Sequence, residues 1–249
     1  MKISSFTLTI CLLTLTLTSY SQEQQKKKKP KRTDNFIRMD GIRLGTDITR
    51  PFQSLWNKGD RYGGEVSADM ELLPNFFPVA EAGWEKFKMD QDYATYNSSG
   101  PYLRIGVNYN FLAAETKADK NIFYCGFRYG ISFAEQTVDS YKISNYWGDM
   151  TGSFPSQKYN SQWIELVLGI KGEVLKNFFL GWSIRGKINV VQKDFDIPGV
   201  YFNPGYGNAE NSMNFDFTYS ISYNFPIHFR KHKNNGGGKP DKEKEEPEK

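Results

Sequence analysis

The chain has 249 residues, of which 24% are charged and 39% are hydrophobic, and this composition argues against a wholly disordered protein. No apolar run after residue 20 approaches the roughly 20 residues of a membrane-spanning helix, so a helical membrane bundle is excluded. The formal charge of +4 is small and its basic excess lies in one early run, so no nucleic-acid partner is expected.

Residues 1–21 have the pattern of a secretory signal peptide. Lys2 supplies a positive start, residues 6–18 are apolar although threonines interrupt them, and Ser19 and Ser21 are small residues at the −3 and −1 positions before Gln22. The apolar stretch is too short for a membrane anchor. We therefore expect export and cleavage before Gln22, which leaves Cys125 as the only cysteine and excludes an internal disulfide.

Two charged segments are expected to flank the folded domain. In the first, residues 22–35, a basic run begins at Lys26 and ends at Arg32. This run is interpreted as a solvated periplasmic tether, or as a contact with anionic lipid headgroups or a polyanionic wall polymer. The second segment, residues 231–249, is of low complexity and mixed charge, and is expected to be disordered.

The region between these segments alternates apolar and polar residues with a period of two, which is typical of β-strands that have one apolar and one polar face. The clearest example is the last, where Phe215, Phe217 and Tyr219 alternate with Asp216 and Thr218. Abundant aromatic residues and glycines also favour β-structure. The pattern predicts eight strands, at residues 42–49, 62–72, 78–85, 103–111, 123–133, 164–173, 180–190 and 215–229.

Eight such strands can form a soluble, lipocalin-like barrel with the apolar face inside, or a membrane barrel with that face outside. The polar face mixes charges with glycine, serine and asparagine, which suits a narrow lumen, and the interiors of the apolar faces contain no charge. Short turns are expected at 73–75, 112–120 and 175–177, and longer outer loops at 53–60, 89–100, 138–160 and 194–211. The prediction is an all-β, eight-stranded, antiparallel, up-and-down transmembrane β-barrel over residues 36–230.

Aromatic residues are expected to form girdles at the two membrane interfaces. The predicted outer girdle comprises Tyr62, Trp84, Tyr102 and Trp163, and the inner one comprises Phe76, Phe111, Phe178, Phe225 and Phe229. Two turns also resemble each other, since ELLPNFF at 71–77 is similar to EVLKNFF at 173–179. This similarity suggests a shared turn design rather than an internal repeat.

Charged residues on the polar face are expected to pair inside the barrel, because unpaired charges in a narrow lumen are costly. The predicted lumen network comprises Arg43, Asp47, Glu65, Asp69, Glu71, Glu81, Glu85, Arg104, Arg128, Glu165, Lys171, Glu173, Arg185, Lys187 and Asp216. A gated path for ions or small solutes is the less favoured interpretation of these residues.

No catalytic residue, cofactor or metal site is predicted. The histidines are His228 and His232, at or beyond the end of the last strand, and the serines of that strand are too distant for a proton relay to His228. No cluster of histidine and cysteine has the spacing of metal ligands, and no nucleotide-binding glycine motif occurs.

Aromatic residues also crowd two predicted outer loops. They either contact a surface protein or glycan, or pack on one another and cap the barrel. The candidate contact residues are Tyr141, Tyr146, Trp147, Phe154, Tyr159, Tyr201, Phe202 and Tyr206.

The leader, the eight alternating strands and the aromatic last strand together resemble small outer-membrane β-barrel proteins of OmpX type. The Ser21-Gln22 leader end, the basic start and the LPNFF turn are similar, more narrowly, to an uncharacterised Bacteroidetes barrel family, a domain of unknown function. The resemblance implies contact with outer-membrane lipids in a Gram-negative bacterium and insertion by the barrel-assembly machinery. That machinery would read the last strand through Phe225, Ile227 and Phe229, although this strand ends before the terminus.

The sequence therefore predicts a non-enzymatic scaffold with a closed, ion-paired lumen and aromatic extracellular loops. Two alternatives stay open at this point. One is a soluble periplasmic barrel that binds an apolar ligand, and the other is an outer-membrane lipid-modifying enzyme.

Overall fold

The computed structural model describes residues 41–51, 60–112, 119–192, 195 and 198–227. The predicted signal peptide, basic tether and charged tail lie outside the described residues, as do His228, Phe229 and His232. Within the described ranges, no helix has both the length and the apolarity needed to cross a membrane.

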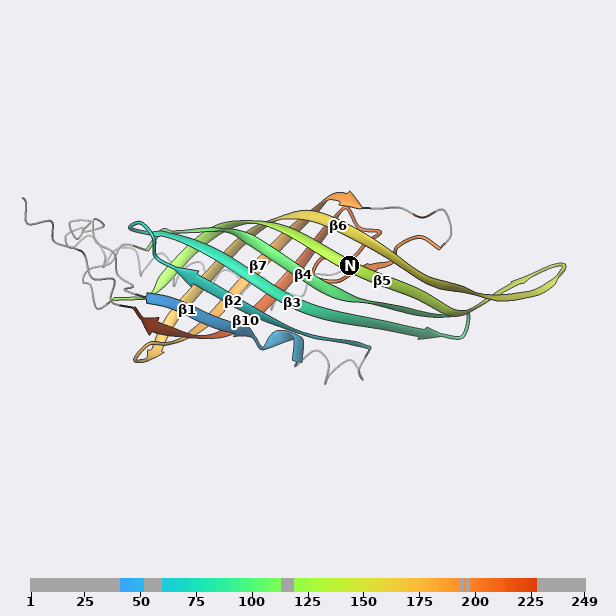
Figure 1. Ribbon diagram of the computed structural model, residues 1–249, viewed down its shortest axis with the longest axis horizontal. Coiled ribbons are helices and arrows are strands. Elements are labelled where there is room, and N and C mark those ends of the chain that lie inside the picture. Colours follow the sequence, from blue (N-terminus) through green and yellow to red (C-terminus); the bar gives the residue numbers. More distant parts are fainter. Residues whose placement is uncertain (1–40, 52–59, 113–118, 193–194, 196–197, 228–249) are drawn as a thin grey trace, which may run out of the picture.

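Eight antiparallel strands close into one hydrogen-bonded ring (Figure 1), which confirms the predicted all-β, eight-stranded barrel. Each strand pairs with its neighbours in the chain, and the first pairs with the last. The barrel strands are β1 (Gly41–Asp47), β2 (Arg61–Met70), β3 (Phe76–Gln91), β4 (Ala94–Asn110), β5 (Ile122–Asn145), β6 (Gly148–Leu175), β7 (Phe178–Gln192) and β10 (Met213–Pro226). Two further strands, β8 (Phe202–Asn203) and β9 (Gly207–Asn208), form a small hairpin between β7 and β10.

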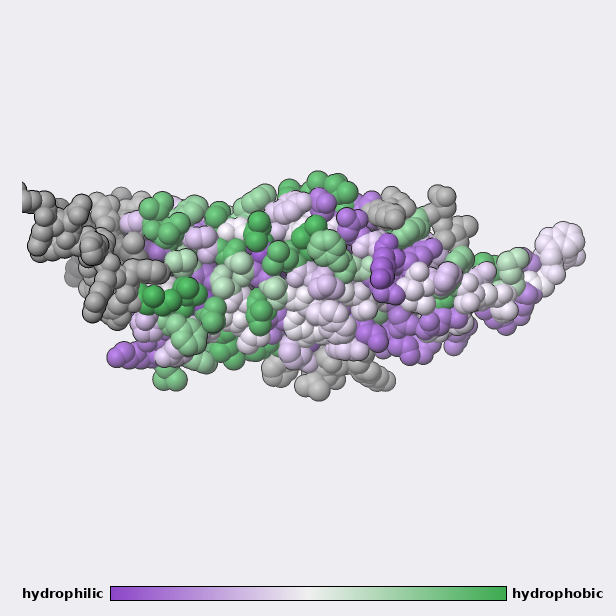
Figure 2. Space-filling view, in the orientation of Figure 1, coloured by the Kyte–Doolittle hydropathy of each residue, from purple (hydrophilic) through white to green (hydrophobic). Residues whose placement is uncertain are grey.

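The apolar face of the barrel points outward. Phe217 is 55% exposed and Leu168 is 48% exposed, whereas Arg128 is 2% exposed and Glu65 is 5% exposed. Figure 2 shows hydrophobic side chains spread over the left and centre of one face of the molecule. The alternative of a lipocalin-like barrel with an apolar interior is therefore wrong, because charged side chains occupy the interior.

The two ends of the barrel differ. At one end, which we call the turn end, the hairpins are tight, and at the other, the loop end, β3 to β6 continue beyond the ends of the other barrel strands (Figure 1). The predicted loops at 89–100 and 138–160 are wrong, because they are mostly strand. β3 pairs with β4 up to Gln91 and Ala94, and β5 pairs with β6 up to Asn145 and Gly148.

The two similar turns share one backbone design. Asn75 and Asn177 both have positive φ, at 67° and 64°. In each turn a glutamate four residues earlier accepts the asparagine N–H: Glu71 Oε1 accepts from Asn75 at 3.0 Å, and Glu173 Oε1 accepts from Asn177 at 2.6 Å. Asparagine tolerates this left-handed conformation better than other non-glycine residues do.

The predicted outer girdle is wrong for two of its members. Trp84 and Tyr62 are exposed on the outside, but Trp163 is 0% exposed and Tyr102 is 3% exposed, and both lie in the lumen. Trp163 Nε1 donates to Glu165 Oε1 at 2.7 Å, and a side chain at Gly130 would collide with the Trp163 ring. The glycine thus makes room for an indole in the barrel interior.

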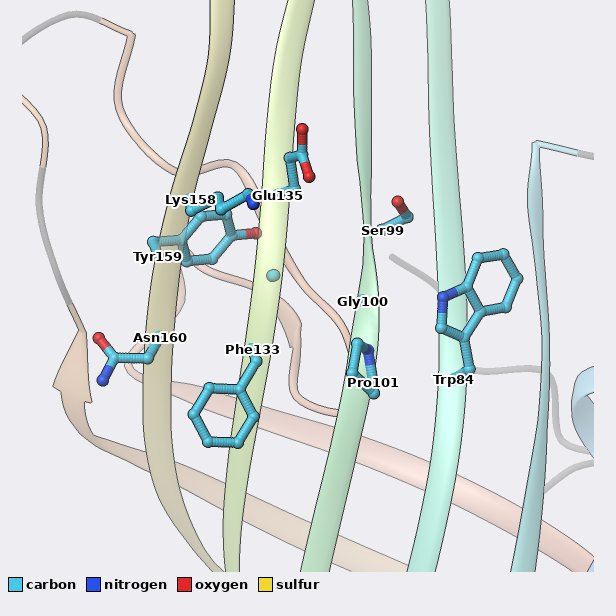
Figure 3. Close-up of a pocket in the computed structure, with 10 residues that line it drawn as sticks. Trp84, Ser99, Gly100, Pro101, Phe133, Glu135, Lys158, Tyr159 and Asn160 are labelled. Carbon is cyan, nitrogen blue, oxygen red and sulfur yellow. The ribbon is translucent and has the colours of Figure 1, made fainter.

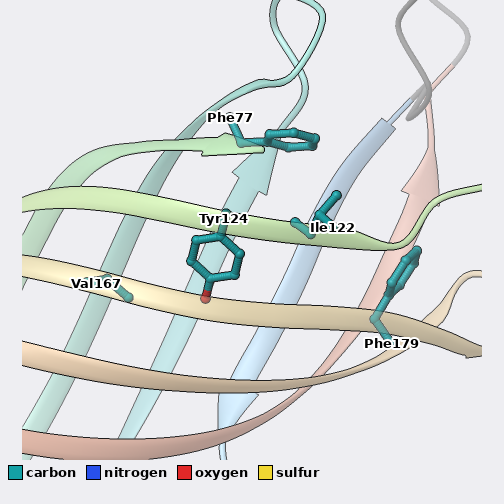
Figure 4. Close-up of a cluster of buried hydrophobic side chains, with 5 residues drawn as sticks. All are labelled: Phe77, Ile122, Tyr124, Val167 and Phe179. Carbon is teal, nitrogen blue, oxygen red and sulfur yellow. The ribbon is translucent and has the colours of Figure 1, made fainter. Parts of the chain in front are cut away.

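An apolar cluster lies at the turn end of the lumen (Figure 4). Its members are Phe77, Ile122, Tyr124, Val167 and Phe179, which come from β3, β5, β6 and β7. Both phenylalanines are completely buried. The barrel interior thus passes from an apolar layer at the turn end to a charged layer in the middle.

Candidate functional site: a charged, plugged lumen

Arg104 is the centre of the charged layer. It is 1% exposed and contacts three carboxylates: Nε lies 3.1 Å from Glu81 Oε2, Nη1 lies 3.1 Å from Glu165 Oε1, and Nη2 donates to Glu65. Arg185 joins the same group, with Nη1 2.6 Å from Glu81 Oε2. Several carboxylates thus share two guanidinium groups. Removing any one of these side chains takes a partner from at least one buried charge.

The charged layer continues toward the turn end through Asp69. This carboxylate lies 2.5 Å from Arg43 Nη2 and 2.6 Å from Lys171 Nζ. The Arg43 guanidinium in turn lies over the Phe179 ring, 5.1 Å from its centroid. A cation–π contact therefore links the charged layer to the apolar cluster.

Toward the loop end lies a central cation, Arg50, that the alternating pattern did not predict. Arg50 is 6% exposed, and its Nη1 lies 2.7 Å from Glu85 Oε1 and its Nε 3.5 Å from Asp47 Oδ2. Arg61 Nε also donates to Glu85, at 2.5 Å. Arg50 comes just after β1, where the alternation of apolar and polar residues ends. The alternation therefore could not indicate that the Arg50 side chain folds back into the lumen.

Most of the predicted lumen residues lie in this layer. Three of them, Arg128, Glu71 and Glu173, also bind groups outside the network of ion pairs or lie at the turns. Arg128 Nε lies 3.5 Å from Glu81, while its Nη2 donates to Asn108 Oδ1 at 2.9 Å. Glu71 and Glu173 lie at the turns and accept backbone N–H groups there, and Glu173 also lies 3.4 Å from Lys120.

The hairpin β8–β9 closes the loop end of the lumen, and we call residues 200–209 the plug. Lys187 Nζ donates to the Gly205 carbonyl at 2.7 Å and to Asp216 at 2.6 Å, and the Gly205 N–H donates to Glu85 Oε2 at 2.8 Å. Phe202 stacks on Phe87 of β3, with ring centroids 4.5 Å apart. The wall of the barrel therefore holds the plug by both polar and aromatic contacts.

The plug lies within the predicted outer loop at residues 194–211, whose aromatic residues were expected either to contact a partner or to cap the barrel. Phe202 is 4% exposed and Tyr206 is 1% exposed, and Tyr159 of β6 is also buried, with its hydroxyl donating to the Phe202 carbonyl at 2.5 Å. The half-buried candidates Tyr141, Phe154 and Tyr201 pack against a buried cluster that Phe202 forms with Tyr96 and Val138. The capping interpretation fits these residues.

Tyr146 and Trp147 behave differently from the other candidates. They form the tip of the β5–β6 hairpin, where they are 93% and 90% exposed and contact each other edge to face, with centroids 5.3 Å apart. In Figure 1 this hairpin extends furthest from the barrel. The tip is held by the Asn145 side chain, which accepts the Trp147 N–H at 2.9 Å.

A groove of about 530 Å³ lies at the loop-end edge of the apolar outer surface (Figure 3). Trp84, Pro101, Phe133 and Asn160 line it on the barrel side, and Ser99, Glu135 and Lys158 line the side nearer the loop end. At Gly100 the backbone of β4 approaches β5 so closely that a side chain would collide with the Phe133 carbonyl. The register between β4 and β5 is the same on both sides of this point, with Ser99 opposite Glu135 and Tyr102 opposite Ser132.

Among the described residues, no group of histidine, cysteine, aspartate or glutamate side chains is arranged to hold a metal ion. The three residues of the predicted assembly signal differ in their positions. Phe225 is exposed in β10, Ile227 follows the end of that strand, and Phe229 lies outside the described residues.

A family model described as "Domain of unknown function (DUF6048)" matches residues 3–231. The chain belongs to the DUF6048 family. This agrees with the expected family of unknown function, while the likeness to barrels of OmpX type stays a prediction. A comparison of the DUF6048 chain with curated proteins gave no significant match.

Two solved structures are similar to this DUF6048 chain. The crystal structure of neisserial surface protein A (NspA) has a TM-score of 0.41 and 8% identity, covering 74% of this chain and 97% of that one. The N-terminal β-barrel domain of Pseudomonas aeruginosa OprF has a TM-score of 0.30 and 10% identity, covering 75% and 98%.

Proposed function

We propose that this protein is a closed, non-enzymatic β-barrel of the bacterial outer membrane that holds a protruding hairpin outside the cell. One observation carries the proposal: a continuous apolar outer surface surrounds a lumen filled by ion pairs. A surface of this kind suits acyl chains, because a lysine or arginine facing lipid near the midplane costs about 2–4 kcal/mol. In this orientation the turn end is periplasmic and the loop end is extracellular.

The lumen supports a passive role rather than transport. An eight-stranded barrel is only wide enough for side chains to fill it. Here the apolar cluster, the charged layer and the plug lie one above another along its length. Outer-membrane lipids and, during insertion, the barrel-assembly machinery are the partners that this role requires.

Tryptophan fluorescence tests the orientation of the barrel in a membrane. Two single-tryptophan variants would keep either Trp182, which stacks on Phe217 on the outer face, or the buried Trp163. In vesicles of brominated phosphatidylcholine, we expect strong quenching of Trp182 and little quenching of Trp163. A chain that stays soluble, with neither residue quenched, would contradict the proposal, and faster migration of the unboiled protein on a gel provides an independent check of folding.

The tip of the β5–β6 hairpin supports surface contact as part of the function. Large exposed aromatic residues are typical of contact sites, and Tyr146 and Trp147 add nothing to the barrel core. Tyr146→Ser with Trp147→Ser should leave folding unchanged while abolishing crosslinks to a surface partner in intact cells. The matched control replaces Tyr93, which is 60% exposed at the β3–β4 turn, with serine. Unchanged crosslinking in the tip variant would exclude the tip as the contact.

A further inference from the structure

The groove beside Trp84 combines two rows of outward-facing residues in register. The lower row is apolar on three of its four strands: Trp84 of β3 lies opposite Pro101 of β4, and Phe133 follows on β5. On β6 the row ends in a polar residue, Asn160, opposite Phe133. The upper row is polar and runs across four strands, because Lys86 lies opposite Ser99, Ser99 opposite Glu135, and Glu135 opposite Lys158. The two rows meet at the edge of the apolar surface, where the fatty and polar parts of a lipid would also meet.

The upper row has a distinctive order of side-chain groups: an ammonium group, a hydroxyl, a carboxylate and a second ammonium group. Neighbouring strands are about 4.8 Å apart, so the two lysines are separated by on the order of 14 Å at the backbone. Glu135 accepts a hydrogen bond from the Ser156 hydroxyl, and Lys86 Nζ lies 5.9 Å from the Tyr62 ring centroid. Among the described residues, no ion pair joins Lys158 to a carboxylate, so this ammonium group is available to a ligand.

We propose that this groove binds a glycolipid whose sugar headgroup carries a phosphate at each end. One phosphate contacts Lys158 of the groove and the other contacts Lys86, which lies opposite Ser99 just beyond the groove lining, while Ser99 and Glu135 bind sugar hydroxyls between the two lysines. The acyl chains lie along Trp84, Pro101 and Phe133. The proposal rests on the membrane orientation given above, since only that orientation places the groove in the outer leaflet.

Glu135 supplies selectivity in this arrangement. A carboxylate in the middle of the row accepts hydrogen bonds from hydroxyl groups but repels a phosphate. A lipid with a single central phosphate therefore fits poorly, whereas a disaccharide places hydroxyls at the centre and phosphates at the ends. The bulky indole of Trp84 and the ring of Phe133 supply the apolar contact area that the chains need.

Lipid retention by the full-length protein tests the proposal. The purified chain would be inserted in phosphatidylcholine nanodiscs containing bisphosphorylated lipid A, monophosphorylated lipid A or phosphatidylglycerol, and the retained lipids counted by native mass spectrometry. We expect bisphosphorylated lipid A to be retained in clear preference to the other two. Lys158→Gln and Lys86→Gln should each reduce its retention about fivefold, the effect expected of one basic residue at an anionic surface.

The control variant is Lys142→Gln, which removes an exposed lysine of the β5–β6 hairpin outside the groove and should not alter retention. Equal retention of phosphatidylglycerol and lipid A, or unchanged retention in Lys158→Gln, would overturn the glycolipid site. A folded, heat-shifted barrel that shows no lipid preference defeats this inference alone. A chain that fails to enter the nanodisc at all defeats the proposed membrane function.

Discussion

The backbone N–H of Gly205 donates to Glu85 Oε2 at 2.8 Å, although the two residues are 120 positions apart in the chain. The other oxygen of the same carboxylate lies 2.7 Å from Arg50 Nη1 and 2.5 Å from Arg61 Nε. A single side chain of the barrel wall therefore holds the plug, the buried Arg50 and the half-buried Arg61.

Replacing this carboxylate should destabilise the barrel strongly. In Glu85→Gln, Arg50 and Arg61 lose a buried counter-charge, a change that typically costs about 3–5 kcal/mol. Urea unfolding of the full chain in detergent micelles measures the loss. Asp149→Asn, which removes the exposed ion pair with Lys142, is the control and should leave the unfolding midpoint in place. Equal midpoints for both variants would show that Glu85 does not hold the loop end together.

The space for Trp163 gives a second stability prediction. Gly130→Ala places a methyl group against the indole, and overpacking of this kind typically costs about 1–3 kcal/mol. Gly64→Ala is a matched control, because nothing lies within 4 Å of a side chain at that position. Unfolding midpoints should therefore fall for Gly130→Ala only. A similar fall for both variants would indicate a general intolerance of alanine in these strands.

The two asparagine turns predict different effects of glycine and a β-branched residue. Asn75→Gly keeps the positive φ and loses only the hydrogen bond that Asn75 Oδ1 accepts from Asn110 Nδ2, whereas Asn75→Val loses the same bond and should cost about 1–2 kcal/mol more for the strained φ. The same pair of changes at Asn177 should behave in the same way. Equilibrium unfolding checks both turns, and an equally stable valine variant would contradict the left-handed conformation.

Removal of the plug should not open a channel. When a short glycine–serine linker replaces residues 200–209, the Arg104 ion pairs and the apolar cluster of Phe77 and Phe179 still fill the lumen. We expect planar-bilayer recordings of this variant to show no steady conductance, like those of the intact chain. Ohmic conductance in the variant alone would mean that the plug is the sole barrier.

The hairpin tip should respond to acid. A hydrogen bond from Lys142 lowers the pKa of Asp149 below its ordinary value of 3.8. Because the folded-state pKa is depressed, the stabilisation is present above the ordinary value and is lost as the pH falls through the lower one. An NMR titration should show this carboxylate ionising at lower pH than in Lys142→Met. Identical titration curves would mean that the ion pair does not form in solution.

The amino-acid sequence by itself determined the strand number, the antiparallel ring and the face on which each strand residue lies. A two-residue period fixes these, because a side chain cannot change face without a shift of register. The same period already grouped Tyr102 with Arg104 and Trp163 with Glu165, so their inward position could have been predicted. A position near the end of a strand is typical of a girdle residue, but the two-residue period decides which face the side chain occupies.

The tertiary structure alone decided how far the strands extend and where the chain between β7 and β10 lies. Beyond the apolar surface both faces of β5 and β6 meet water, so the apolar alternation disappears although the backbone pairing continues. The plug is held by contacts such as Gly205 with Glu85 and Tyr159 with Phe202, which join residues far apart in the chain. No local pattern encodes such contacts, since they exist only once the barrel has closed around them.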